Sequence, residues 1–162
     1  MSKISWNDYF MSLAFLTSLK TKDPNTAHGS VIIDEQNRVV SLGYNGSVQG
    51  IDDTQVPWES REKLDYICHA EFNSILFAQR SLKNCILYVT GHPCTMCTRM
   101  ICQVGIKQVY FGPVVSRSVD TKSQRISQKL FSLSNVQVTE YKNNLNYVID
   151  MLKSQFNKYF KV

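Results

Sequence analysis

The sequence contains no apolar run that approaches the roughly 18 residues of a membrane-spanning helix. Its first ten residues, MSKISWNDYF, lack the apolar stretch of a secretory signal peptide, so export is not expected. Five Cys are an odd number, and without an export signal they argue against a disulfide framework. With only seven Gly, four Pro and no internal repeat, a fibrous or low-complexity chain is excluded. These absences predict a soluble, cytoplasmic protein with no membrane partner.

The length and composition are those of an ordinary globular domain. The chain has 162 residues, of which 43% are apolar and 19% are charged. A chain of this length buries roughly 70% of the surface that its unfolded form exposes, which suffices for a core without disulfides. Residues 1–162 are therefore expected to form a single domain.

The net charge of +5 is unevenly distributed along the chain. Residues 1–98 carry 8 basic and 10 acidic side chains, whereas residues 99–162 carry 10 basic and 3 acidic ones. A basic half attracts phosphate groups, on a nucleotide or on a nucleic acid, although it is equally typical of a solvated face. Charge alone does not choose between these possibilities.

Hydrophobic periodicity predicts helices that alternate with strands after residue 74. Ser5 and Asp8 form a capping pair that opens a first helix, which ends before the Lys22–Asn25 stretch. Further helices are expected at 69–80, 94–105, 121–131 and 145–159, and strands at 30–33, 38–42, 85–90, 106–111 and 136–140. The alternation favours an α/β fold, a three-layer sandwich in which a mixed five-stranded sheet has helices on both faces. Between 43 and 58 we expect a long polar loop, a kind of segment that is often functional.

The sequence His69-Ala70-Glu71, followed by Pro93-Cys94-Thr95-Met96-Cys97, matches the H-x-E…P-C-x-x-C signature of zinc nucleobase deaminases. Cys94 and Cys97 are spaced to place two thiolates on the first turn of one helix, where its dipole stabilises them. With His69 they form a set of three ligands, which leaves one tetrahedral position open, as in catalytic zinc sites. Glu71 is close to the metal without being needed as a ligand, so it is the candidate general acid and base.

Two other interpretations of these residues stay open. The C-x-x-C pair is also compatible with a redox dithiol, although Thr-Met between the cysteines is unlike thioredoxin. A closed structural zinc site would need a fourth ligand, for which His92 is the nearby candidate, yet its position better suits the lining of a pocket. The remaining cysteines, Cys68, Cys85 and Cys102, are expected to be small buried hydrophobic residues. His28 is expected to be a structural residue.

From Trp6 to Tyr141 the sequence resembles the deoxycytidylate (dCMP) deaminase family of the cytidine deaminase superfamily. The zinc motif alone reaches only the superfamily, and other stretches narrow the resemblance. These stretches are Tyr9-Phe10-Met11, Ala14-Phe15-Leu16, Lys22-Asp23-Pro24-Asn25, Gly43-Tyr44-Asn45-Gly46, Pro57-Trp58, Cys68-His69-Ala70-Glu71 and Gly105-Ile106-Lys107.

The resemblance implies hydrolysis of dCMP to dUMP and ammonia with one catalytic Zn²⁺ per chain and a cytidine-deaminase-like fold. Zinc lowers the pKa of its water toward about 7, and the resulting hydroxide would attack C4 of cytosine while Glu71 moves the proton. By the same resemblance Asn45 would bind the substrate sugar, and the backbone N–H of Ala70 would bind the pyrimidine carbonyl.

The resemblance also implies regulation and assembly. The family is commonly a homohexamer that dCTP activates and dTTP inhibits, with Mg²⁺ accompanying the triphosphate. The residues expected to border this regulatory site are Gly43, Tyr44, Asn45, Gly46, Asp52 and Asp53.

The sequence departs from the family pattern at two places. The segment 112–120 lacks the Tyr expected near the sugar, and Arg117 in it is instead a candidate for the substrate phosphate. His28 stands where the family usually has a small apolar residue.

Two alternative functions are compatible with the sequence: a tRNA adenosine deaminase, which would use the basic half, and a non-enzymatic zinc-binding interaction module. The dCMP interpretation expects no nucleic-acid partner.

Overall fold

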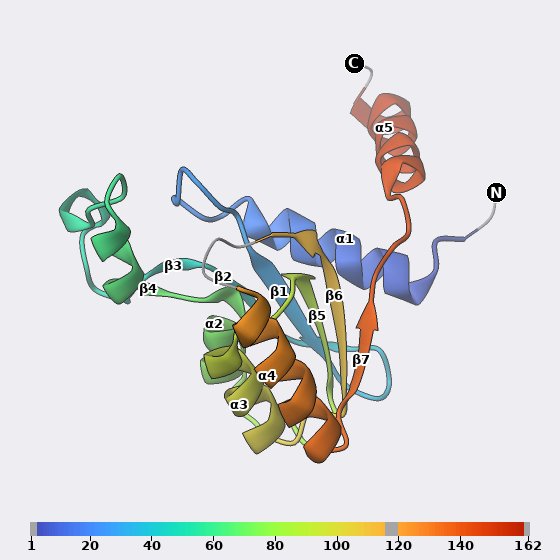
Figure 1. The fold of residues 1–162 in the computed structure, drawn as a ribbon. Coiled ribbons are helices and arrows are strands. Elements are labelled where there is room, and N and C mark those ends of the chain that lie inside the picture. Colours follow the sequence, from blue (N-terminus) through green and yellow to red (C-terminus); the bar gives the residue numbers. More distant parts are fainter. Residues whose placement is uncertain (1–2, 116–119, 161–162) are drawn as a thin grey trace.

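A five-stranded mixed sheet with strand order β2–β1–β5–β6–β7 forms the centre of the molecule. The structure is a computed structural model, which describes residues 3–115 and 120–160 (Figure 1). β1 pairs antiparallel with both neighbours, whereas β5, β6 and β7 run parallel. This sheet confirms the predicted mixed topology. The strands are β1 (Gly29–Ile33), β2 (Val39–Tyr44), β5 (Ile86–Gly91), β6 (Gln108–Val114) and β7 (Gln137–Glu140).

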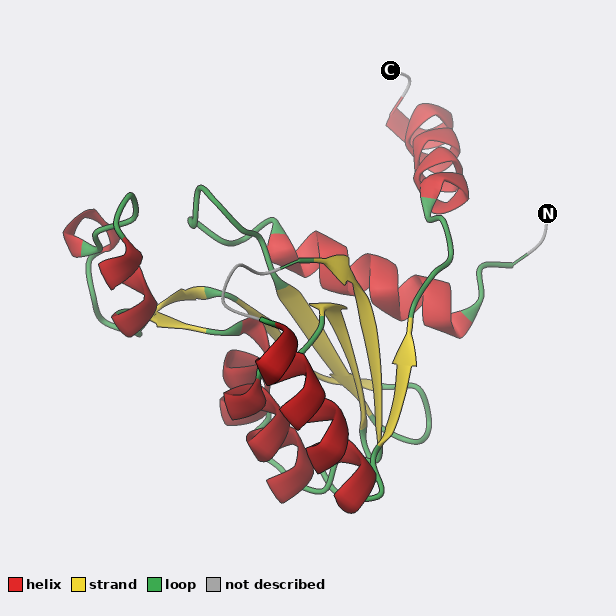
Figure 2. Ribbon diagram, viewed as in Figure 1, coloured by secondary structure: helices red, strands yellow, loops and turns green. Residues whose placement is uncertain are grey.

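Helices cover both faces of the sheet, which confirms the three-layer prediction (Figures 1 and 2). β1 is buried along its whole length, so its side chains alternate between two cores. Val31 belongs to the core under α1 (Trp6–Ser18), and Ile32 belongs to the core on the opposite face. That second face is covered by three helices, α2 (Ala70–Leu76), α3 (Thr95–Gln103) and α4 (Thr121–Leu133).

Helix boundaries follow the capping chemistry. The predicted cap of α1 is confirmed: the hydroxyl of Ser5 accepts a hydrogen bond from the backbone N–H of Asp8 at 3.1 Å. α2 is shorter than predicted, because it ends at Leu76 and the chain turns through a left-handed conformation at Gln79 (φ 51°).

The segment predicted as a long polar loop is more regular than expected. Its first residues, Gly43 and Tyr44, complete β2, and a short hairpin follows, formed by β3 (Gly46–Ser47) and β4 (Ile67–Cys68). Two 3₁₀ helices lie between these strands, η1 (Asp53–Gln55) and η2 (Arg61–Asp65). This part of the chain projects from one side of the sheet in Figure 1. The prediction of a loop therefore holds from residue 48 to 58 apart from η1, whereas the first residues of the segment belong to β2 and β3.

A buried carboxylate, Asp8, joins α1 to the segment after β7. It accepts hydrogen bonds from Ser5 (2.6 Å), Asn143 (3.0 Å), Tyr147 (2.6 Å) and Tyr141. Burial acts to raise the pKa of Asp8, but these four donors outweigh it and hold the pKa far below its usual range. The carboxylate therefore stays charged inside the fold.

Helix α5 (Asn146–Phe160) forms as predicted and extends away from the sheet (Figure 1). Val148 is its buried residue, whereas its apolar side chains Ile149, Leu152 and Phe156 are about half exposed. No helix among residues 3–115 and 120–160 is both long and apolar enough to cross a membrane.

The cysteines outside the motif do not all follow the prediction. Cys85 is buried in the core as expected. Cys102 is only partly buried against that core, and Cys68, in β4, is also partly exposed. The prediction was wrong for these two: Cys68 lies on a two-stranded hairpin with no layer above it, and Cys102 lies near the end of α3, at the margin of the core.

Candidate functional site

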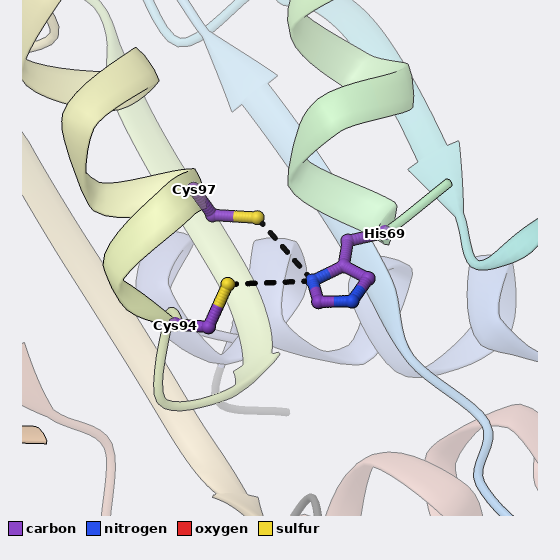
Figure 3. Close-up of side chains that lie close together, drawn as sticks. All are labelled: His69, Cys94 and Cys97. Atoms are coloured by element: carbon purple, nitrogen blue, oxygen red, sulfur yellow. Dashed lines mark hydrogen bonds between the residues drawn. The ribbon is translucent and has the colours of Figure 1, made fainter. Parts of the chain in front are cut away.

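The structure brings the side chains of His69, Cys94 and Cys97 together at one point (Figure 3). Nδ1 of His69 lies 3.5 Å from the Sγ atom of Cys94 and 3.5 Å from that of Cys97. Ligands held about 2.3 Å (sulfur) and 2.0–2.1 Å (nitrogen) from a tetrahedral zinc lie about 3.5 Å apart. The donor set and its spacing therefore fit Zn²⁺, with three protein ligands.

Two helix starts position these ligands. His69 is the residue before α2, Cys94 is the residue before α3, and Cys97 lies in the first turn of α3. Neither His69 nor Cys94 uses its side chain to cap its helix, so both are free to point at the same place. The unpaired N–H groups at the start of α3 favour negative charge on its cysteines.

The electrostatics of the two thiols differ. A hydrogen bond with Cys97, together with His69, lowers the pKa of Cys94 to about 4 in spite of burial. The hydrogen bond with Cys94 and burial raise the pKa of Cys97. One thiolate is thus present among the protein groups alone, and a divalent cation would displace the second proton.

Glu71 lies in the first turn of α2, two residues after His69, and is only 6% exposed. Burial is the main cause that raises its pKa, while the nearby His69 acts to lower it. A carboxyl group with a raised pKa next to a metal site is suited to take up and return a proton near neutral pH. The geometry therefore allows the role predicted for Glu71.

The start of α2 is docked directly on the sheet. The hydroxyl of Ser30, in β1, lies 2.8 Å from the carbonyl oxygen of Ala70 and 2.9 Å from the hydroxyl of Ser74. On β2, Gly43 has no side chain to separate the two elements: an added Cβ would lie 2.2 Å from the Ala70 carbonyl oxygen. This backbone contact fixes the height of Glu71 and His69 above the sheet.

A pocket of about 370 Å³, here called the metal pocket, opens in front of these residues. Its lining combines the metal-site residues with a polar wall from the segments 23–28 and 59–64. The lining residues are Asp23, Asn25, Thr26, His28, Asn45, Glu59, Ser60, Arg61, Lys63, Leu64, Ile67, His69, Ala70, Glu71, Gly91, His92 and Cys94. Its size suits a small ligand such as a nucleotide.

The predicted substrate residues Asn45 and Ala70 both line the metal pocket. Ala70 is the first residue of α2, so its backbone N–H has no acceptor within the helix. Asn45 is 4% exposed and already supports the neighbouring loop: its Oδ1 accepts from the N–H of His28 at 2.8 Å, and its Nδ2 donates to the carbonyl of Thr26 at 3.0 Å. One amide hydrogen of Asn45 is left for a ligand.

An ion pair across the pocket wall joins the segment of η2 to the loop before β1. Nζ of Lys63 lies 2.6 Å from Oδ1 of Asp23, and both side chains are at least 90% buried. Sequence reasoning did not single out this pair, because no motif distinguishes it from surface charges. It holds the projecting segment over the pocket.

Two further histidines line the pocket. His28 was expected to be structural, and the lining position shows that it also faces the site. His92 lies in the wall as the sequence suggested, with its ring packed edge-on against Phe111 at a centroid distance of 4.8 Å. Burial and the nearby His69 lower the pKa of His28, so its imidazole is neutral at pH 7.

The residues predicted for the regulatory site do not all line one pocket. A second pocket of about 430 Å³, here called the loop pocket, is lined by Gly43, Tyr44, Gly46 and Asp53 of that set. Asn45 lines the metal pocket instead, and Asp52 lines neither, because its carboxylate caps η1 through Thr54. The other residues of the loop pocket are Lys20, Lys22, Leu42, Ser47, Gln49, Trp58, Asn73 and Phe77.

Asp53 is the centre of the loop pocket. It accepts hydrogen bonds from Lys22 and from the hydroxyl of Ser47 (2.6 Å), and these lower its pKa. Its carbonyl accepts from the indole of Trp58 at 2.8 Å. Arg117, the predicted phosphate residue, lies outside the described residues.

The fold and the metal site together define a class of protein, the zinc-dependent nucleobase deaminases. The family model described as "Cytidine and deoxycytidylate deaminase zinc-binding region" matches residues 4–113, and the chain belongs to this family.

Several relatives in it are deoxycytidylate deaminases. The deoxycytidylate deaminase of Pongo abelii is 37% identical to the chain over 140 residues, which cover 82% of this chain and 78% of the relative. The enzyme of Homo sapiens is 36% identical over the same shares. Among solved structures, the dCMP deaminase of cyanophage S-TIM5 in complex with dCMP and dUMP superposes with a TM-score of 0.68 at 23% identity. That match covers 87% of this chain and all of the other, and it shows that the fold is shared.

Proposed function

We propose that residues 1–162 act as one deaminase domain that hydrolyses dCMP to dUMP and ammonia. The observation that carries the proposal is the placement of His69, Cys94 and Cys97 within ligand distance of one another, with the buried Glu71 in the same pocket. The names of the relatives give the substrate class.

The chain's own residues account for the steps around the base. His69, Cys94 and Cys97 would hold the zinc, whose chemistry would be to activate a water for attack at C4 of cytosine. Glu71 accepts the proton of that water and returns it to the base, so that ammonia leaves. The N–H of Ala70, at the start of α2 in the lining of the metal pocket, would donate to the carbonyl of the pyrimidine and so orient the ring.

A phosphate on the substrate needs a cation in the metal pocket. Lys63 is occupied by Asp23, whereas Arg61 is exposed and has no ion pair among the described residues. We expect Arg61 to bind the phosphate of dCMP, together with Arg117, the candidate in the segment 112–120 that departs from the family pattern. Arg61→Ala should then raise the KM for dCMP about tenfold and leave turnover of deoxycytidine, which has no phosphate, unchanged.

The experiment is an assay of ammonia release by the zinc-loaded full chain on dCMP, CMP, deoxycytidine, cytidine, dCTP and a short adenosine-containing RNA. We expect the highest kcat/KM on dCMP, and no turnover in Glu71→Gln. Deamination of the RNA with a steep dependence on salt would instead identify a tRNA adenosine deaminase. Full zinc content without turnover of any substrate would identify an interaction module.

The proposal extends to regulation and assembly. The loop pocket combines two lysines, Lys20 and Lys22, with the aromatic rings of Tyr44 and Trp58, a set that suits a nucleotide triphosphate. We expect dCTP to activate and dTTP to inhibit there, with Mg²⁺ held between the phosphates and Asp53. By resemblance the assembly is a homohexamer, which light scattering on the purified chain measures.

Rate curves against dCMP concentration, recorded without effector, with dCTP and Mg²⁺, and with dTTP and Mg²⁺, test the regulation. Three superimposable curves would contradict it. Inhibition by dTTP that raises only the apparent KM and persists after substitution of Lys22 would point to competition in the metal pocket.

A further inference from the structure

His28 is the residue of the metal pocket whose presence the deamination chemistry leaves unexplained. It precedes β1, and its backbone is held on both sides by Asn45: its N–H donates to Oδ1 at 2.8 Å, and its carbonyl accepts from the N–H at 3.2 Å. The side chain lines the same pocket as Glu71 and Cys94. The position of the ring relative to the metal site is therefore tightly fixed.

The orientation of the ring is also fixed. Nδ1 of His28 lies 3.3 Å from the hydroxyl of the fully buried Thr90. The same hydroxyl oxygen accepts the backbone N–H of Gly29 at 3.1 Å, so Thr90 is itself held in place. In either tautomer of the imidazole, this contact anchors the Nδ1 side of the ring.

The ring of His28 fits because the neighbouring residue on β5 has no side chain. Gly91 lies beside it, and an added Cβ there would come within 2.8 Å of Cε1 of His28 and 2.3 Å of the carbonyl oxygen of Val114. Nε2 is buried and has no hydrogen-bond partner among the described residues. A buried polar atom without a partner costs free energy that an apolar side chain would avoid, so the fold alone gives no reason for an imidazole here.

The ring of His28 is also the one in the pocket that is not packed against another ring or placed in the metal site. Among the described lining residues there is no Phe, Tyr or Trp, and His69 belongs to the metal site. Nε2 of His92 is buried without a partner as well, but the ring of His92 packs edge-on against Phe111, and its Nδ1 donates to the carbonyl of Pro93 at 2.9 Å.

We infer that the imidazole of His28 is the aromatic wall on which the base of the substrate stacks, and that Thr90 and Gly91 are positioning residues that hold it there. The inference rests on the proposed function for the identity of the base. A planar base gains from stacking on an aromatic ring whichever groups it carries, so the contribution is to binding rather than to the proton transfers.

Four variants of the zinc-loaded full chain separate the ring from the volume and from the hydrogen bond. His28→Phe keeps a ring without nitrogen, His28→Leu keeps similar volume without a ring, and His28→Gln keeps a donor without a ring. Thr90→Val removes the hydroxyl that orients the imidazole, with Thr139→Val on the exposed edge strand as its control.

We expect His28→Leu and His28→Gln to raise the KM for dCMP about tenfold with kcat within about threefold of the wild type. His28→Phe should return the KM to within about twofold, and Thr90→Val should lie between them. Zinc content and melting temperature are measured for each variant, because a purely structural residue would lower the melting temperature and leave the KM of the folded fraction unchanged.

Three outcomes would overturn the inference: an unchanged KM in His28→Leu, a His28→Phe variant as defective as His28→Leu, or rescue by His28→Gln alone, which would assign a hydrogen bond instead of a stacked ring. Calorimetric binding of dCMP to Glu71→Gln, with and without His28→Leu, adds a readout without turnover. If that parent binds dCMP and the double variant binds equally well, only the role of His28 is refuted. If the wild type neither binds nor deaminates dCMP, the proposed function itself fails.

Discussion

The metal pocket and the loop pocket meet at the end of β2, where Tyr44 lines the loop pocket and the next residue, Asn45, lines the metal pocket, but different forces hold them together. The metal pocket is built on helix starts and buried groups, with Glu71 and Cys97 at 6% and 1% exposure. The loop pocket is closed by the ion pair of Lys22 with Asp53, in which the Lys22 side chain is 66% exposed. Buried groups on packed helices keep their geometry, whereas exposed ion pairs are weak and are screened by salt. This difference in rigidity agrees with the two proposed roles, in which the metal pocket carries out the reaction and the loop pocket binds a regulatory nucleotide.

The largest expected effect is loss of the metal pocket's ligands. Cys94→Ala and Cys97→Ala should each lose zinc and activity together, because two remaining ligands do not hold a tetrahedral site tightly. Metal analysis alongside the deamination assay checks this, with Cys85→Ala as a core-cysteine control that should keep its zinc. Full zinc occupancy in either motif variant would remove that cysteine from the ligand set.

The next effect separates chemistry from metal binding within the same pocket. Glu71→Gln should keep its zinc and its fold and lose about 10²–10⁴-fold in kcat, since a general acid–base group contributes about that much. Because the proposed mechanism uses Glu71 at more than one proton transfer, the loss is expected at the upper end. The control is Glu140→Gln on the exposed edge strand. A variant that retains a tenth of the wild-type rate would contradict the assignment.

A substitution at the wall between the two pockets should damage both. Gly43 lines the loop pocket, yet the space beside its Cα is filled by the backbone of α2. Gly43→Ala should lower the free energy of unfolding by about 3 kcal/mol and reduce kcat by moving Glu71. In the control, Gly46→Ala, an added Cβ meets only the Tyr44 side chain at 3.3 Å, so stability should change little. Equal melting temperatures for both variants would argue against a rigid contact of β2 with α2.

The smallest effect on basal activity is expected in the loop pocket itself. Lys22→Ala breaks the ion pair with Asp53 and removes a cation from the proposed triphosphate site, so the responses to dCTP and dTTP should be lost. Without effector, kcat and the melting temperature should match those of the wild type, because an exposed ion pair contributes little stability. Lys129→Ala on α4 is the control. An unchanged dTTP response in Lys22→Ala would place the regulator elsewhere.

The two pockets also differ in how far the sequence predicted them. Cys94 and Cys97 are close in sequence and on one helix, so local spacing alone predicted their meeting, and His69 joined them through a known motif. The sheet and the helices followed from periodicity in the same way. The loop pocket depends on contacts such as Lys22 with Asp53, 31 residues apart, which no local pattern encodes. Asn45 was predicted both at the substrate sugar and at the regulatory site, and it lines the metal pocket alone, whereas Tyr44 lines the loop pocket. Successive residues of an extended chain point to opposite sides, which a motif treated as a loop does not reveal.

His28 shows a second limit of sequence reasoning. A histidine before a strand carries no periodic signal, and its significance depends on Thr90 and Gly91, more than 60 residues away. The one signal in the sequence was Gly91, at the end of a buried strand. A glycine at such a position indicates that another group packs closely against the backbone. Only the three-dimensional structure identifies that group as the ring of His28.

The Asp8 network has a consequence for how the chain folds during synthesis. The donors Tyr141, Asn143 and Tyr147 follow Asp8 by 133, 135 and 139 residues. At about 5–20 residues per second, a ribosome needs roughly 7–27 s to make that stretch. For all of this time α1 carries a carboxylate that has only Ser5 as a side-chain donor. The apolar face of α1 packs on β1 and β5 as soon as those strands exist, but the start of the helix around Asp8 is among the last parts of the fold to be completed.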